Sequence, residues 1–144
     1  MTWYLTVRSD CRYGESVSTC VLVTYLDSVP GLRRTGLSSY QTEEGLDWIH
    51  VTIAACNSTG SYAVYADRVP QRVNKVLLIC SSSGGGYAIA LALAEKIADL
   101  LGWEVADDES DEVQYTAPAI PVPARCAVEC SACATPGGRQ SSLT

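Results

Sequence analysis

Three segments of the chain have the hydrophobic pattern of β-strands. Residues 3–8 (WYLTVR) and 48–56 (WIHVTIAAC) alternate apolar and polar positions, which indicates strands with one buried face. Residues 75–80 (KVLLIC) are apolar on both faces, as expected of a central strand. In the second segment the residues expected on the buried face are Ile49, Val51, Ile53 and Ala55. Shorter strands are predicted at residues 37–41 and 103–106, with an edge segment at residues 61–69.

Two further segments have helical spacing. The first follows Ser18 or Thr19, either of which can cap a short helix, and it ends before Pro30 and Gly31. The second covers residues 87–101 and ends at Gly102, which suits a left-handed terminating position. Its large apolar residues Ile89, Leu93 and Ile97 fall four residues apart, which predicts that this stripe packs into the core.

The order of these elements predicts an α/β protein of the α+β kind. The elements follow in the order β-α-β-β-(β)-β-α-β, with the edge segment in parentheses, which favours a ferredoxin-like fold or a related two-layer sandwich. We expect a mostly antiparallel sheet of four to five strands with both helices on one face. Composition divides the chain into an α/β domain at residues 1–106 and a flexible tail at residues 107–144, which begins acidic and continues with proline, alanine and cysteine.

The formal net charge of −6 is concentrated in one short segment. Residues 1–103 carry nine acidic and eight basic residues, whereas residues 104–112 carry six acidic residues and no basic one. Such a surface repels nucleic acid and anionic membranes and attracts a basic partner. We therefore expect a protein partner, with no nucleic acid and no membrane. The predicted contact residues are Asp107, Asp108, Glu109, Asp111 and Glu112.

Composition also bears on location and on the role of cysteine. The longest apolar stretch, residues 87–101, is shorter than the ~20 residues that a membrane span requires and carries three charges. The start of the chain lacks the pattern of a secretory signal, so we expect a cytoplasmic protein. Seven cysteines without such a signal argue against a disulfide framework. Cys20, Cys56 and Cys80 lie in apolar runs and are expected to act as small buried hydrophobic residues.

Three groups of residues are weak candidates for chemistry. His50 is the sole histidine, and six residues along a strand separate it from Cys56 by about 20 Å, too far for a catalytic pair. Cys126, Cys130 and Cys133 have ligand-like spacing, but no fourth ligand lies nearby in the sequence, so we expect no metal. The glycine-rich loop Ser81–Gly86 precedes a helix, where an anion can bind, yet it matches no phosphate-binding motif. We therefore expect no catalytic residue and no cofactor.

Several segments resemble those of small uncharacterised bacterial proteins. They are residues 3–10 (WYLTVRSD), 33–36 (RRTG), 72–80 (RVNKVLLIC) and 100–104 (LLGWE), and the resemblance ends near residue 106. In size and acidity these proteins are similar to immunity proteins of bacterial toxin systems. The resemblance implies a protein that blocks a toxin by binding it, and it implies no catalytic residues.

The sequence therefore favours an immunity or antitoxin-like protein that binds and occludes a toxin or effector enzyme. Occlusion requires no active site, and complementary charge increases association rate and selectivity. One alternative is a small enzyme or ligand-binding domain that holds an anionic ligand at the Ser81–Gly86 loop. Another is a phage-type inhibitor of bacterial defence, which has the same physical requirements as an immunity protein.

Overall fold

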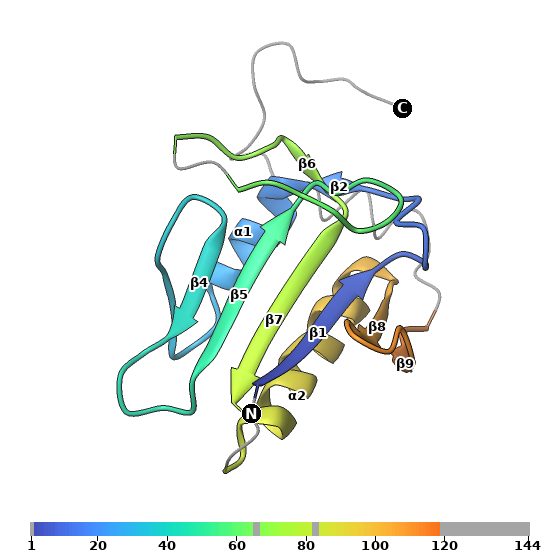
Figure 1. Ribbon diagram of the computed structural model, residues 1–144. Coiled ribbons are helices and arrows are strands. Elements are labelled where there is room, and N and C mark those ends of the chain that lie inside the picture. The colour runs from blue at the N-terminus through green and yellow to red at the C-terminus, as the bar shows by residue number, and fades with distance from the viewer. Residues whose placement is uncertain (1, 65–66, 82–83, 119–144) are drawn as a thin grey trace.

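The computed structural model describes residues 2–64, 67–81 and 84–118 (Figure 1). These ranges form a mixed α+β fold of short strands and two helices. The helices are α1 (Thr19–Asp27) and α2 (Gly86–Leu101). The strands are β1 (Thr2–Arg8), β2 (Val17–Ser18), β3 (Leu32–Arg34), β4 (Ser39–Thr42), β5 (Ile49–Ala54), β6 (Arg72–Val73), β7 (Lys75–Ser81), β8 (Glu104–Asp107) and β9 (Val113–Thr116).

Seven of the strands form one sheet in the order β3-β4-β5-β7-β1-β8-β9, and every pairing within it is antiparallel. This confirms the predicted α+β class and the predicted direction of pairing. The sheet is wider than the four to five strands expected. The additions include the edge strands β3 and β9, of three and four residues, which are too short to show a period of two.

Both helices lie on the same face of the sheet (Figure 1). The alternating residues of the central strands point into the layer between the helices and the sheet and are almost completely buried. They include Leu5, Val7, Ile49, Val51, Ile53, Val76, Leu78 and Cys80. The predicted strand at residues 75–80 is central, as its uniform apolarity indicated, because β5 and β1 pair with its two edges.

The ends of α2 follow the sequence more closely than the start of α1 does. Gly102 adopts a left-handed conformation (φ 72°) and its N–H donates to the carbonyl of Ala98, so the predicted terminator of α2 is confirmed. Ser18 occupies the N-cap position of α1 but its side chain makes no capping hydrogen bond. The Thr19 hydroxyl instead donates to the carbonyl of Pro70 and ties α1 to the segment before β6.

The predicted edge segment at residues 61–69 forms no strand in its described part, residues 61–64 and 67–69. The Asn57 side chain accepts hydrogen bonds from the N–H groups of Thr59 and Ser61 and closes a turn there. Beyond the predicted boundary at residue 106, β8 turns into β9, which pairs with it. Residues 119–144, with Cys126, Cys130 and Cys133, lie outside the described residues.

Candidate functional site

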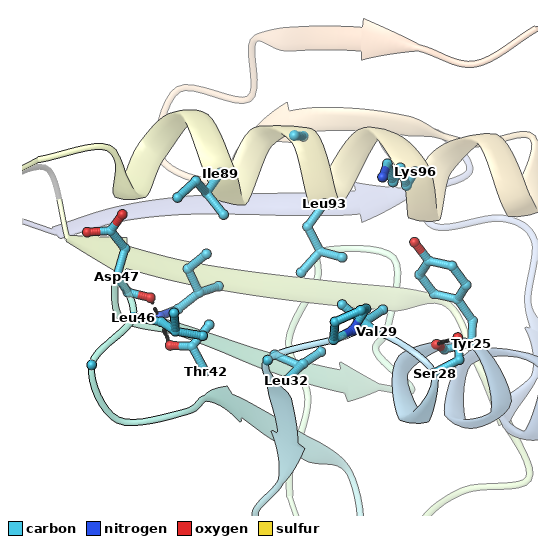
Figure 2. A pocket seen from close by; sticks show the side chains of 15 residues that line it. Tyr25, Ser28, Val29, Leu32, Thr42, Leu46, Asp47, Ile89, Leu93 and Lys96 are labelled. Carbon is cyan, nitrogen blue, oxygen red and sulfur yellow. Dashed lines mark hydrogen bonds between the residues drawn. The ribbon is translucent and has the colours of Figure 1, made fainter.

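A groove of about 620 Å³ opens on the helical side of the molecule, between α2, the end of α1 and the β4–β5 turn (Figure 2). Its floor is formed by Leu32 and Ile49, both of which are buried. The groove exists because α1 ends at Asp27, after nine residues. The chain then turns into β3, so α1 covers only part of β4 and β5 (Figure 1). A concave apolar surface of this size is within the range of known binding sites.

The side of α2 that faces the groove carries large aliphatic residues. Ile89 and Leu93 line the groove, and Ile89 is 50% exposed, so the prediction that it packs into the core is wrong. Small residues face the sheet instead: Ala90, Ala94 and Ala98 are completely buried. Small side chains allow a helix to pack closely on a sheet, and Ile97 is the one residue of the expected stripe that is fully buried. Ile89 and Leu93 are therefore the large apolar residues of α2 that line the groove.

The opposite lip is the turn between β4 and β5. Leu46 lies on it and is 54% exposed, facing the groove with Ile89 across from it (Figure 2). Hydrogen bonds fix the turn, because the Thr42 hydroxyl donates to the carbonyl of Asp47 and accepts from the N–H of Ile49. Gly45 has φ 93°, a conformation that favours glycine. Leu46 is thus held on a shaped turn at the mouth of the groove.

Charged groups stand at both ends of the groove. Glu43, Glu44 and Asp47 are exposed on the β4–β5 turn, and within the described ranges no cation pairs with their carboxylates. Asp47 lies beside Gly84 and Gly85, immediately before α2, where a helix dipole favours a negative charge. Lys96 lies two turns along α2 from Ile89 and also has no ion-pair partner among the described residues. The groove therefore has an acidic end and a basic end.

The five predicted contact residues lie together on and beside the β8–β9 turn, but they are not equally available. The carboxylate of Asp107 accepts hydrogen bonds from the N–H groups of Glu109 and Ser110 and closes the turn. Asp108 accepts from the Thr6 hydroxyl at 2.5 Å and lies 3.5 Å from the ammonium of Lys75.

The Asp111 carboxylate accepts a hydrogen bond from the Arg8 guanidinium at 2.5 Å. Glu109 and Glu112 remain exposed, with no side-chain ion pair among the described residues. Three of the five predicted acids therefore serve the fold, and two are available to a partner.

Arg8 and Lys75 are two buried basic residues that were not among the predicted site residues. The two residues are 2% and 5% exposed. Burial disfavours the charged form of Arg8, but hydrogen bonds to Asp111 and Glu104 outweigh it and raise the pKa of the guanidinium. The Lys75 ammonium donates to the carbonyl of Gly60 and lies over the rings of Tyr13 and Tyr62, at 5.6 and 5.2 Å.

The alternation of residues along β1 and β7 is the sequence feature that could have identified Arg8 and Lys75. A period of two places both residues on the sheet face that carries no helix. This face is also where the acidic turn folds back, so the two bases neutralise charges that the sequence assigned to a partner.

His50 lies half-buried on β5, with its ring stacked beside that of Trp48. Burial lowers its pKa below the ordinary value, and the Thr52 hydroxyl lies 3.4 Å from Nδ1. Cys80 is buried and free, as expected, and Cys56 is free but only partly buried. Cys20 is buried but disulfide-bonded, so the expectation that it is a free thiol is wrong. Burial raises the pKa of Cys56 and of Cys80, which opposes formation of a nucleophilic thiolate.

The Ser81–Gly86 loop joins β7 to α2 as predicted, with residues 82–83 outside the described ranges. Glycine is required at position 86, because an added Cβ would lie 2.9 Å from the carbonyl oxygen of Ser81. The carboxylate of Asp47 lies near Gly84 and Gly85, 3.6 Å from where each Cβ would stand. A negative charge at this place opposes the binding of an anionic ligand to the loop.

Across the part of the chain that the structure describes, no three His, Cys, Asp or Glu side chains are placed to share a metal ion. Neither described helix is long and apolar enough to cross a membrane. Comparison with known protein families gives no match, and comparison with curated proteins gives no significant one.

Proposed function

We propose that this protein binds a basic partner protein and occludes it, in the manner of an immunity or antitoxin protein acting on a toxin or effector enzyme. The observation that carries the proposal is the groove between α1, α2 and the β4–β5 turn, which we call the α1–α2 groove. Its apolar lining adjoins the Asp47 carboxylate, and Glu43 and Glu44 are exposed on the same turn; within the described ranges none of the three is paired with a cation. Interfaces of this kind combine an apolar centre with a charged rim. The proposal includes a cytoplasmic location. A phage-type inhibitor of bacterial defence would use the same surface in the same way.

The acidic β8–β9 turn is the second surface that could contact the partner. Only Glu109 and Glu112 are available there, because the remaining acids are engaged with Arg8, Lys75 and the turn backbone. Charges that are already paired attract a partner less than unpaired ones do. In this proposal Glu109 and Glu112 increase the association rate with a basic partner, and the groove forms the interface of the stable complex.

The experiment compares two variants that remove equal charge. The immobilised full-length chain captures proteins from an extract of the native host, and the captured protein is then assayed for its own enzyme activity. We expect the chain to abolish that activity at a one-to-one ratio. We expect Glu43→Gln with Glu44→Gln to weaken capture more than Glu109→Gln with Glu112→Gln.

If both double substitutions weaken capture of the partner equally, the attraction depends on net charge alone. Retention of full enzyme activity by the captured protein at saturation would overturn the proposal of occlusion. Failure to capture any specific protein would also count against it.

A ferredoxin-like core is part of the same proposal. The four central strands run β5-β7-β1-β8, α1 follows β1, and α2 connects β7 to β8. This order supports a split β-α-β arrangement with β3, β4 and β9 as additions at the edges. An anionic ligand at the Ser81–Gly86 loop is a weaker alternative, because the Asp47 carboxylate lies beside that loop.

A further inference from the structure

We infer that the α1–α2 groove receives an amphipathic helix of the partner protein, with basic residues at the end beside the β4–β5 turn. This inference rests on the proposed function and adds the structural class and orientation of the partner's binding segment. It follows from three properties of the groove, which are its length, its half-exposed aliphatic lips and its charged ends.

The length of the groove matches a helical stripe. Along α2 it extends from Ile89 to Lys96, which is two helical turns or about 10 Å at 1.5 Å per residue. A partner helix presents apolar residues at i, i+3, i+4 and i+7, and the first and last of these are also about 10 Å apart. One apolar stripe of an incoming helix therefore covers the floor formed by Leu32 and Ile49.

The two sides of the groove expose apolar surface, and burying that surface would stabilise a complex. Ile89 and Leu46 are 50% and 54% exposed and stand on opposite sides of the groove. Leu93 lies further along α2 and points into the groove (Figure 2). Burying these aliphatic groups together stabilises a complex by removing apolar area from water. A groove with two aliphatic walls holds the apolar stripe of a helix between them.

The charges at the two ends set the direction of the incoming helix. Three carboxylates at the β4–β5 turn attract lysine or arginine, and Lys96 attracts aspartate or glutamate at the other end. The N-terminus of a helix carries a partial positive charge and its C-terminus a partial negative one. The favoured arrangement places the N-terminus and the basic residues of the partner helix at the acidic end, so that it runs in the same direction as α2.

The probe is a phage-displayed library of peptides about 18 residues long, a length that can form a helix on binding. Leucine is fixed at positions i, i+3, i+4 and i+7, and the remaining positions are random. The full-length chain is the target. We expect enriched sequences to carry Lys or Arg toward the N-terminus and Asp or Glu toward the C-terminus. A synthetic peptide of the enriched sequence is then titrated by fluorescence anisotropy.

Two variants remove the lips, and a third is the matched control. Ile89→Gln and Leu46→Gln replace exposed aliphatic groups at the groove. Each is expected to lower the affinity of the chain for the peptide by about tenfold or more. Val113→Gln makes the same kind of change on β9, where Val113 is 45% exposed, and is expected to leave the affinity unchanged. Circular dichroism of each variant shows whether it remains folded, and all three positions are exposed enough to accept a polar side chain.

Three results would overturn the inference. The first is no enrichment of helical sequences. The second is enrichment of peptides that bind as extended strands on the β3 edge, which Ile89→Gln would not weaken. The third is a dimer of the free chain that Ile89→Gln dissociates, because the groove would then bind a second copy.

The partner experiment distinguishes failure of this inference from failure of the proposed function. Capture and inhibition of a host enzyme that persist unchanged in Ile89→Gln would leave the proposed function standing and refute the groove as its site. Peptide binding without inhibition of any captured enzyme would support the groove and refute occlusion.

Discussion

Arg8 offers the sharpest test of how the acidic turn is held. Its guanidinium, 3% exposed, contacts the Glu104 carboxylate at 2.9 Å and the Asp111 carboxylate at 2.5 Å. Distance alone ranks Asp111 as the stronger partner. Exposure reverses the order, because the Glu104 side chain is 19% exposed and that of Asp111 is 64% exposed. Water screens the second pair much more than the first.

The expected magnitudes follow from that difference. A hydrogen bond to a charged group in a poorly hydrated site contributes about 1.5–3 kcal/mol, so we expect this coupling energy between Arg8 and Glu104. An ion pair with a well-exposed member contributes about 1 kcal/mol or less, so we expect this value for Arg8 and Asp111. Arg8→Met should reduce the free energy of unfolding by about 3 kcal/mol, because it leaves Glu104 largely buried without its cation.

The assay is urea denaturation followed by tryptophan fluorescence, to which the buried Trp103 contributes together with the exposed Trp3 and Trp48. Double-mutant cycles pair Arg8→Met with Glu104→Gln and, separately, with Asp111→Asn. Arg12→Met is the control for loss of an exposed arginine and should change the free energy of unfolding by less than about 0.5 kcal/mol. A coupling energy for Asp111 equal to or above that for Glu104 would refute the argument from exposure.

Three further changes test the core and the sheet. Ile97→Ala should lower the free energy of unfolding by about 2–5 kcal/mol because the side chain is fully buried. Leu93→Ala, at the groove, should lower it by less. Equal denaturant midpoints for the two variants would contradict the placement of α2. Tyr40→Phe removes a 2.9 Å hydrogen bond from a buried hydroxyl to Asp27 and should cost about 1 kcal/mol in the same assay. Burial lowers the pKa of His50, so the unfolded chain takes up a proton first as pH falls through about 6.5, and stability should decline below that pH. His50→Gln should flatten this dependence between about pH 7.5 and 5.5, and an unchanged slope would exclude His50 as its source.

The sequence by itself determined the parts of the fold that depend on local pattern. Residues 75–80 are apolar on both faces, and a strand of that kind is stable only where sheet and helices surround it. Ile49, Val51 and Ile53 alternate with polar neighbours, which sets the face of β5 that is buried. Gly102 ends α2 because a left-handed residue is needed there. These features require no knowledge of distant residues.

The tertiary structure decided which face of α2 is buried and where the charges go. Nearly every face of α2 carries apolar residues, so periodicity alone could not choose between Ile89 and Ala90. Close packing on the sheet selected the small residues and left Ile89 to form the wall of the groove. The partners of Arg8 lie 96 and 103 positions away in the chain. An acidic segment considered by itself predicts a surface for a partner. Folding brings the buried Arg8 to this segment, and the acidic residues neutralise it because an unpaired charge in the interior is strongly destabilising.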